Sequence, residues 1–312
     1  MAEEKQYDIV IVGGGPGGLT AGLYGARAER KTVVIEKFMV GGQIANTAEV
    51  EDYPGFEMIS GAELAQKMAD HARKFGLEIV ADEVKEVYVD GDSRVVECTS
   101  GDIYRAKTVI LSTGGAPNKL GVPGEEEYTG RGVSYCAICD GAFFKGQVIA
   151  VVGGGDAACE EGIFLTKFGS RVYIIHRRDQ LRAAKIIQSR TLKNDKIEVV
   201  WDTIVESING DGAKVSDLTL KNVKTGEKTT LKVGAVFPFL GFRPNSNVVR
   251  ESLRKDQGGY ILTDEKMETS VKGIYAVGDV RHQLVRQITN AVGDGTTAAM
   301  AAEKYMEDLE DK

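Results

Sequence analysis

Two cysteines three positions apart stand in the stretch GVSYCAICDGAFF, residues 132–144, and an acid and a glycine follow them directly. A zinc site would need two more ligands at suitable spacing, but the chain has no second CxxC and its three histidines are distant in sequence. A structural disulfide is uncommon in a reducing compartment. A redox dithiol needs an attacking thiol, a resolving thiol and a nearby proton carrier. This chemistry fits Cys136, Cys139 and Asp140, which we predict to be a redox site.

An internal repeat offers places for the cofactors that such a site needs. DIVIVGGGPGGLTAGLYGARAERKTVVIEK begins at Asp8, and QVIAVVGGGDAACEEGIFLTKFGSRVYIIHRR begins at Gln147. Equivalent positions differ by a constant 140 residues, and they are Gly13 and Gly153, Gly15 and Gly155, Gly18 and Ala158, and Glu36 and His176. The constant offset indicates two copies of one unit.

Each copy reads as an apolar strand, a glycine-rich turn, a helix of small residues and a second strand, over residues 32–35 and 172–175. This is the βαβ context in which a dinucleotide fingerprint is expected. The first glycine permits a tight turn, the second lets the backbone approach a pyrophosphate, and the third small residue lets helix and strand pack closely. The helix N-terminus supplies N–H groups and partial positive charge. The sequence therefore predicts two dinucleotide sites.

The two copies differ chemically at the end of the second strand. Glu36 can accept hydrogen bonds from ribose hydroxyls. The second copy instead has HRRDQLR, which contains His176, Arg177, Arg178 and Arg182. Arginines bind a 2'-phosphate through charge-assisted contacts, whereas a carboxylate would repel it. The cluster favours NADPH over NADH at the second site, and the alternative is a solvated basic loop.

A flavin is the natural relay between a nicotinamide and the cysteine pair. Hydride transfer and disulfide reduction each move two electrons, but direct transfer between the two groups is unusual. The first dinucleotide unit offers a place for FAD. The second unit would hold NADPH in the same domain as the cysteines.

Two linkers indicate the domain boundaries. APNKLGVPGEEE contains two prolines and two glycines, and GFRPNSN precedes a late strand, GIYAVGDV, that ends at Gly278 and Asp279. Return of this late strand to the first domain would make that domain discontinuous. Residues 77–109 read as alternating strands of a β-meander. We expect an α/β fold with two Rossmann-like FAD/NAD(P)-binding domains in a three-layer ββα organisation: residues 1–117 with 247–312 for FAD, and 118–246 for NADPH and the CxxC.

Composition limits the partners and the compartment. The 312 residues suffice for two domains, and a formal net charge of -7 argues against a nucleic-acid or membrane-surface binder, since both need a basic face. We expect no signal peptide in MAEEKQYDIVIVGGGPGG, and no apolar run approaches the roughly 20 residues of a membrane span. Four sparse cysteines suit a reducing compartment. The chain is expected to be cytoplasmic, without metal, nucleic-acid or membrane partners.

The whole chain resembles the low-molecular-weight thioredoxin reductases, the class II pyridine nucleotide-disulfide oxidoreductases. CAICDG looks like the family's CATCDG, with Ile138 in place of Thr. GGGPGG, GGQ, STGG and GDV followed by RQ are similar to its FAD elements, and GGGDAACEE with HRRDQLRA is similar to its NADPH elements. The resemblance implies FAD and NADPH as cofactors, thioredoxin as the substrate, a homodimer, and rotation of the NADPH domain about hinges near Pro117 and Arg243.

The resemblance also implies the roles of individual residues. Cys139 would lie against the flavin and take its electrons, Cys136 would attack the disulfide of thioredoxin, and Asp140 would act as acid and base. The residues implied to bind FAD are Gly13, Gly15, Pro16, Gly18, Glu36, Gly42, Gln43, Thr113, Gly114, Gly278, Asp279, Arg286 and Gln287. Those implied to bind NADPH are Gly153, Gly155, Asp156, Ala158, His176, Arg177, Arg178 and Arg182.

Some positions depart from the family pattern, and other functions stay open. Ala157 replaces a frequent Ser or Thr, His282 stands where Asp is common, Val285 replaces a frequent aromatic residue, and FPFLG puts Pro238 into a strand. None of these changes removes a catalytic group, but they bear on rate and donor preference.

Two alternative functions stay open. One is a flavoprotein that reduces another small redox partner, peroxiredoxin-linked or glutaredoxin-like, and the other is a redox-sensing binding protein that uses the cysteine pair only as a switch.

Overall fold

The computed structural model describes residues 3–47 and 50–311, and the chain divides into two compact units. Unit 1 contains Met1–Ala116 and Arg243–Lys312, and unit 2 is Pro117–Phe242. Both divisions lie within the two linkers that the sequence analysis names. The chain passes between the units twice. The two crossing segments, β7 (Gly115–Pro117) and β15 (Phe242–Pro244), form a two-stranded sheet.

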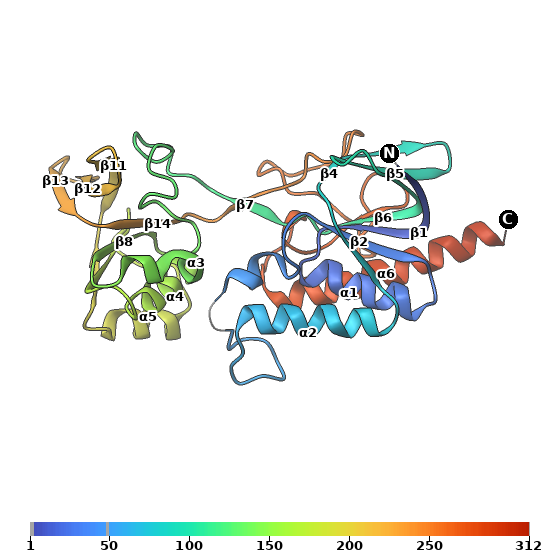
Figure 1. The fold of residues 1–312 in the computed structure, drawn as a ribbon, viewed down its shortest axis with the longest axis horizontal. Helices are drawn as coiled ribbons and strands as arrows, with labels where there is room; N and C mark the ends of the chain where they lie inside the picture. The colour runs from blue at the N-terminus through green and yellow to red at the C-terminus, as the bar shows by residue number, and fades with distance from the viewer. Residues whose placement is uncertain (1–2, 48–49, 312) are drawn as a thin grey trace. The chain divides into compact units, whose positions relative to one another are not determined.

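Unit 1 is built on a seven-stranded sheet of order β3-β2-β1-β6-β5-β4, with β16 beside β6 (Figure 1). Strands β3, β2, β1, β6 and β16 pair in parallel. Strand β5 pairs antiparallel with β6 on one side and with β4 on the other. The strands are β1 (Glu4–Val12), β2 (Thr32–Glu36), β3 (Glu78–Ala81), β4 (Val84–Asp90), β5 (Ser93–Cys98), β6 (Ile103–Leu111) and β16 (Ile274–Ala276). The predicted meander over 77–109 is therefore wrong for β3. This edge strand pairs parallel with β2, because its half-buried Ile79 and Val80 pack against the apolar clusters on the two faces of the sheet.

Three helices cover one face of this sheet, namely α1 (Pro16–Arg27), α2 (Gly61–Lys74) and α6 (Ile288–Glu310) (Figure 1). Strand β1 is apolar on both faces because both are covered. Ile9 and Ile11 pack with the helices, while Val10 and Val12 pack in a second cluster with residues of β4 and β5. The Ser60 side chain caps α2, since it accepts a hydrogen bond from the Glu63 N–H at 3.2 Å.

Unit 2 repeats the plan on a smaller scale. Its parallel sheet has the order β10-β9-β8-β14, and a three-stranded antiparallel sheet, β11-β12-β13, packs on one face of it. The parallel strands are β8 (Val148–Gly153), β9 (Arg171–Ile175), β10 (Ile197–Val200) and β14 (Ala235–Phe239); the others are β11 (Thr203–Gly210), β12 (Val215–Asn222) and β13 (Lys228–Lys232). The helices are α3 (Ala137–Asp140), α4 (Asp156–Leu165) and α5 (Lys185–Lys193). Both units confirm the predicted α/β class. Pro238 is tolerated in β14 because an edge strand loses little from a missing N–H.

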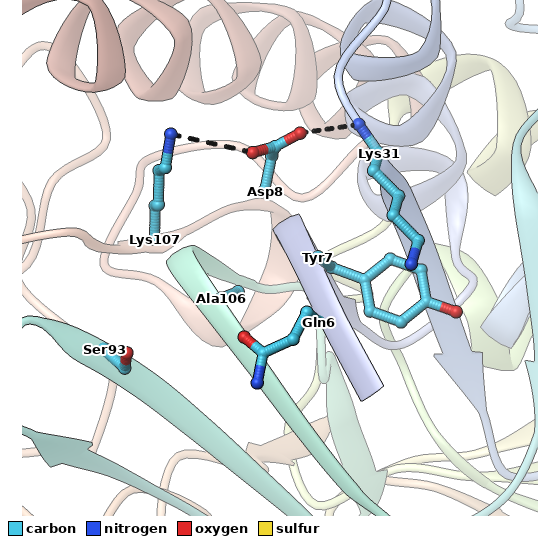
Figure 2. A pocket seen from close by; sticks show the side chains of 7 residues that line it. All are labelled: Gln6, Tyr7, Asp8, Lys31, Ser93, Ala106 and Lys107. Atoms are coloured by element: carbon cyan, nitrogen blue, oxygen red, sulfur yellow. Dashed lines mark hydrogen bonds and ion pairs between the residues drawn. The ribbon is translucent and has the colours of Figure 1, made fainter. Parts of the chain in front are cut away.

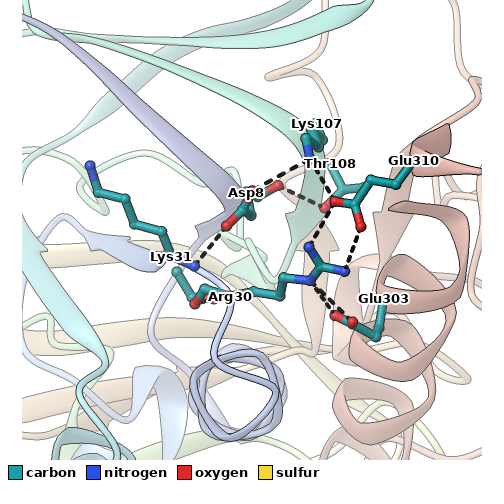
Figure 3. Close-up of polar contacts among 8 residues, drawn as sticks. Asp8, Arg30, Lys31, Lys107, Thr108, Glu303 and Glu310 are labelled. Atoms are coloured by element: carbon teal, nitrogen blue, oxygen red, sulfur yellow. Dashed lines mark hydrogen bonds and ion pairs between the residues drawn. The ribbon is translucent and has the colours of Figure 1, made fainter. Parts of the chain in front are cut away.

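Charged residues fasten the end of α6 to the start of the sheet in unit 1 (Figure 3). The Arg30 guanidinium, which follows α1, contacts Glu303 at 2.9 Å and Glu310 at 2.9 Å. Lys107 on β6 also lies 2.9 Å from Glu310 and 3.8 Å from Asp8 on β1. The network joins three elements that are distant in sequence, and so it stabilises the packing of α6 on the sheet.

Candidate dinucleotide sites and redox segment

The first glycine turn follows β1 and has room for a backbone but not for side chains. Gly13 has φ of 102°, a conformation that favours glycine, and a Cβ there would lie 2.3 Å from the Ser112 carbonyl oxygen. A Cβ at Gly18 would lie 2.0 Å from the Gly13 carbonyl oxygen. At Gly15, in contrast, no described atom lies within 4 Å of a Cβ position. The turn is thus closed toward the protein and open at Gly15, where a pyrophosphate would approach.

Glu36 and the loop after β2 lie against this turn. The Glu36 carboxylate accepts hydrogen bonds from the Gly14 N–H at 2.6 Å and from the Phe38 N–H at 2.9 Å, so it is held in place by its own backbone surroundings. The Gly41 N–H donates to the Gly14 carbonyl at 2.7 Å, and a Cβ at Gly42 would lie 3.3 Å from Gly15 Cα.

The neighbouring side chain of Gln43 donates to the Gly115 carbonyl at 3.2 Å, beyond the end of β6. The Ser112 N–H donates to the Val12 carbonyl, and the Val277 N–H donates to the Leu111 carbonyl. The ends of β1, β6 and β16 therefore lie together. Carboxyl ends of parallel strands are the edge at which α/β sheets bind ligands.

The late segment around Gly278 completes this edge. Asp279 is half-buried, and burial raises the pKa of its carboxyl while the charge of Arg286 lowers it. The Arg286 guanidinium stacks on the Tyr260 ring with 4.1 Å between its central carbon and the ring centroid. Gln287 is the residue that precedes α6 as its N-cap. The structure thus gathers the predicted FAD residues at one edge of the sheet of unit 1.

Sequence reasoning missed two residues that hold this edge. Asn245 exchanges hydrogen bonds with Thr113: its side chain donates to the Thr113 carbonyl at 2.9 Å, and the Thr113 hydroxyl donates to the Asn245 carbonyl at 2.8 Å. The buried Asp294 accepts from the Gly278 N–H at 3.0 Å and lies 3.2 Å from the Arg281 guanidinium. Asp294 could have been recognised from its position, because this acid lies three residues after Ala291, on the apolar face of a helix.

The second glycine turn follows β8 in unit 2 and repeats the first. A Cβ at Gly153 would lie 2.4 Å from the Phe239 carbonyl oxygen and 2.7 Å from Cβ of Ala158, whereas no described atom lies within 4 Å of a Cβ position at Gly155. Asp156 begins α4, and its carboxylate accepts a hydrogen bond from the Ala184 N–H at 2.7 Å. The open position again lies where a pyrophosphate would approach.

The basic cluster after β9 divides into one buried and three exposed residues. The His176 ring is buried against Gly154 with Nε2 at 3.0 Å from the Gln180 carbonyl, and burial lowers its pKa. Its packing makes it a support of the turn. Arg177, Arg178 and Arg182 are exposed, and none of them has an ion-pair partner among the described residues. Three unpaired guanidinium groups beside the turn suit a phosphate.

The redox segment crosses unit 2 beside β14. The Ser134 N–H donates to the Val236 carbonyl at 3.0 Å, and the Ser134 hydroxyl accepts from the Cys136 N–H at 3.1 Å. Cys136 is disulfide-bonded, and the Asp140 N–H donates to its carbonyl at 3.2 Å. The side chain of Cys139 lies outside the described part of the structure. The segment therefore fixes Cys136 through its backbone at the start of α3.

A buried carboxylate supports the same segment from the linker side. Glu125 accepts hydrogen bonds from the Tyr135 hydroxyl at 2.7 Å and from the N–H groups of Leu120 at 2.8 Å and Gly121 at 2.7 Å. It thereby fastens the residue before Cys136 to the chain that enters unit 2. Glu125 was not among the residues predicted from the sequence.

The other two cysteines do not share the redox chemistry. Cys98 and Cys159 are free and buried. Burial raises the pKa of the Cys98 thiol to about 12, and it also raises the pKa of the Cys159 thiol. Both are therefore thiols at neutral pH and poor nucleophiles.

A shallow pocket of about 490 Å³ lies at the amino ends of β1 and β6, opposite the glycine turn, and its lining includes Tyr7, Asp8, Lys31 and Lys107 (Figure 2). No cluster of three or more His, Cys, Asp or Glu within residues 3–47 and 50–311 is arranged to hold a metal. Over the same residues, every helix is too short or too polar to span a membrane.

Comparisons with known proteins identify the family of the chain. The pyridine nucleotide-disulphide oxidoreductase family matches residues 7–295. The chain is 48% identical to the thioredoxin reductase of Bacillus subtilis (strain 168) over 311 residues, covering 100% of this chain and 98% of that protein. The Lactococcus lactis thioredoxin reductase structure (FR conformation) matches with a TM-score of 0.94 at 48% identity, covering 97% of this chain and 99% of that one. The T. acidophilum thioredoxin reductase structure matches with a TM-score of 0.92 at 35% identity, covering 98% and 99%.

These matches confirm the resemblance to low-molecular-weight thioredoxin reductases and the Rossmann-like character of both units. They extend over nearly the full length of each chain, including both glycine turns and the redox segment. The chain belongs to the pyridine nucleotide-disulphide oxidoreductase family.

Proposed function

We propose that this chain is an NADPH-dependent thioredoxin-disulfide reductase, in which electrons pass from NADPH through FAD and the Cys136/Cys139 pair to the disulfide of thioredoxin. The observation that carries the proposal is the coexistence of two open glycine turns, at the carboxyl edges of two sheets, with a CxxC segment in the second unit. Full-length similarity to named thioredoxin reductases supports it.

Unit 1 is the proposed FAD domain. The open backbone at Gly15 and the N-terminus of α1 suit the pyrophosphate, and Glu36 is already oriented at the end of β2 for ribose. Asp279 and Arg286 close the same edge from the late segment. Bound there, FAD would supply the two-electron relay between nicotinamide and disulfide.

Unit 2 is the proposed NADPH domain. Gly155 and the N-terminus of α4 suit the pyrophosphate, and Arg177, Arg178 and Arg182 suit the 2'-phosphate. His176 stays neutral because of its burial and keeps Gly154 in position. NADPH and the cysteine pair would thus share one unit, whereas FAD belongs to the other. This division supports alternating access to the flavin by rotation about the crossings at Pro117 and Arg243.

The cysteine pair performs the proposed transfer to thioredoxin by thiol–disulfide exchange. The Cys136 thiolate attacks one sulfur of the thioredoxin disulfide, which breaks the S–S bond of thioredoxin and forms a mixed disulfide. Cys139 then attacks Cys136 Sγ, which releases reduced thioredoxin and restores the Cys136–Cys139 bond. Asp140 supplies the proton that the leaving thiolate takes up.

The same resemblance supports a cytoplasmic homodimer that uses neither nucleic acid nor a membrane as partner. Free thiols at Cys98 and Cys159 accord with a reducing compartment.

Separating the two half-reactions tests the proposal. Cys136→Ser and Cys139→Ser should each abolish reduction of thioredoxin while they retain NADPH oxidation by an artificial electron acceptor, since that acceptor takes electrons before the dithiol. Cys159→Ser, a buried free thiol of the same unit, is the matched control and should keep both activities. Loss of both activities in the Cys136 variant would contradict the proposed order of transfer. A redox-sensing binding protein would instead show no NADPH-dependent reduction of thioredoxin in the unmodified chain.

A further inference from the structure

Arg286, one of the predicted FAD residues, rests on an aromatic ring. The central carbon of its guanidinium lies 4.1 Å from the centroid of the Tyr260 ring. Arg286 is exposed, and among the described residues its guanidinium forms neither a hydrogen bond nor an ion pair. An arginine that is free to rotate loses conformational entropy when it binds a ligand, which weakens the binding. The ring restricts Arg286 beforehand and covers only the face of the guanidinium, so the N–H donors at its edge stay available.

A tight turn over residues 256–260 holds this ring. The Asp256 carboxylate accepts hydrogen bonds from the Gly258 N–H at 2.8 Å and from the Tyr260 N–H at 3.0 Å. The Asp256 N–H in turn donates to the Tyr260 carbonyl at 2.9 Å. Aspartate commonly closes turns by bonding to the backbone two residues on. Both backbone polar groups of Tyr260 are therefore bonded to one residue, Asp256.

His282 joins this turn to the segment that carries Arg286. Its Nδ1 donates to the second oxygen of the Asp256 carboxylate at 2.8 Å. The His282 N–H also donates to the Ile261 carbonyl at 2.8 Å, in the residue that follows Tyr260. The chain at Tyr260 and the chain that leads to Arg286 are thus bonded together through both side chain and backbone.

The stack lies at the edge of unit 1 where the predicted FAD residues gather. Arg286 directly precedes Gln287, the N-cap of α6. The same helix holds the Gly278 turn, because Asp294 accepts a hydrogen bond from the Gly278 N–H at 3.0 Å. The start of α6 therefore brings Arg286 to the edge that the proposed function assigns to FAD.

We propose that Tyr260 is a positioning residue for flavin binding: its ring holds the Arg286 guanidinium in the orientation that binds FAD, and the His282–Asp256 pair holds the ring. The exchange at position 282 acquires a role in this way. An aspartate, which is common there in the family, would repel Asp256, whereas the imidazole donates a hydrogen bond to it. The inference rests on the proposed function in assigning FAD to unit 1.

A double-mutant cycle on the full-length holoprotein tests the coupling. The oxidised protein is diluted without NADPH or thioredoxin, free FAD is separated by ultrafiltration, and its fluorescence gives the dissociation constant of FAD. Tyr260→Leu should raise this constant about fivefold, within the range for a stacked cation. Arg286→Ala should raise it by at least about tenfold, because a charge-assisted contact is lost. The double variant should match Arg286→Ala within about twofold, since the ring acts only through the arginine.

Conservative and matched variants separate positioning from folding. Tyr260→Phe keeps the ring, so its dissociation constant should stay within about twofold of the native value. Tyr88→Leu is the matched control, because Arg250 stacks on Tyr88 at 4.0 Å in the same unit but outside the predicted FAD residues. This control should leave the constant unchanged. His282→Ala should raise it about threefold in the native background, as expected for an exposed ion pair, and should add nothing to Tyr260→Leu.

Effects of Tyr260→Leu and Arg286→Ala that multiply in the double variant would overturn the inference, because the ring would then act without the arginine. A loss in Tyr260→Phe or in Tyr88→Leu as large as that in Tyr260→Leu would overturn it as well. These results would leave the proposed function intact. A native protein that binds no FAD would overturn the proposed function together with the inference.

Discussion

Removing one arginine of the exposed cluster should change cofactor choice without changing stability. Arg177 and Arg178 are exposed and have no ion-pair partner among the described residues, so Arg177→Ala or Arg178→Ala breaks no contact that supports the fold. Surface substitutions of this kind usually alter the free energy of unfolding by less than about 0.5 kcal/mol. Any large effect on activity would then come from binding.

The size of the effect follows from the contact that is lost. A hydrogen bond to a charged group contributes about 1.5 to 3 kcal/mol, which corresponds to a factor of about 10 to 150. Each single variant should therefore raise KM for NADPH by about 10- to 150-fold with kcat little changed, because the 2'-phosphate is bound equally in the ground and transition states. NADH lacks this phosphate, so its kcat/KM should change by less than about twofold.

The assay is steady-state reduction of thioredoxin with each nucleotide at fixed ionic strength. Arg171→Ala is the matched control, because Arg171 lies at the opposite end of β9 and pairs with Glu198 on the surface at 2.6 Å. It should leave both KM values within about twofold. Equal weakening of NADPH and NADH in the Arg177 or Arg178 variants would refute the phosphate-binding role of the cluster.

Three further predictions follow from other contacts. Gly18→Ala places a Cβ 2.0 Å from the Gly13 carbonyl oxygen, so the purified protein should lose most of its bound flavin by absorbance, whereas Gly293→Ala in α6, with no described atom within 4 Å, should retain it. Asp294→Asn removes the partner of the largely buried Arg281 and should lower the free energy of unfolding in urea by about 2 to 4 kcal/mol; a loss below about 0.5 kcal/mol would contradict a structural role. Arg30 and Lys107 hold the pKa of Glu310 at about 2, below the ordinary value of about 4.3. The Tm difference between the native protein and Glu310→Gln should therefore stay constant above about pH 5 and vanish as pH falls toward about 2, and a difference that persists there would count against the ion pair.

The repeated unit could be predicted because its signals are local. A strand, a glycine turn and a helix N-terminus follow one another along the chain, so Gly13, Gly18 and Gly153 could be assigned from spacing, and their close backbone contacts agree with that assignment. The redox role of the cysteine pair could likewise be predicted from the CxxC spacing and from the acid that follows. The chemistry of these motifs depends on neighbours in sequence.

Contacts between distant segments could not be predicted. The bonds of Asn245 with Thr113 join residues that flank the whole of unit 2, and no local pattern marks them. The place of β3 depended on which strand it would meet, because a short apolar strand fits a meander or a parallel sheet equally well. The burial of the Glu161 carboxyl depends on tertiary packing around α4, so its sequence context, CEEG, reads only as a polar helix face.

The central claim is that NADPH reduces a flavin in this chain and that the flavin passes its electrons to thioredoxin through the cysteine pair. The most direct measurement is an anaerobic titration of the purified protein with NADPH while the flavin spectrum is recorded, a parallel titration with NADH, and then addition of oxidised thioredoxin. The account predicts that NADPH bleaches the flavin at far lower concentration than NADH, and that thioredoxin restores the oxidised spectrum in the native protein but not in Cys136→Ser. A flavin that stays oxidised with NADPH, or that thioredoxin fails to reoxidise, would contradict it.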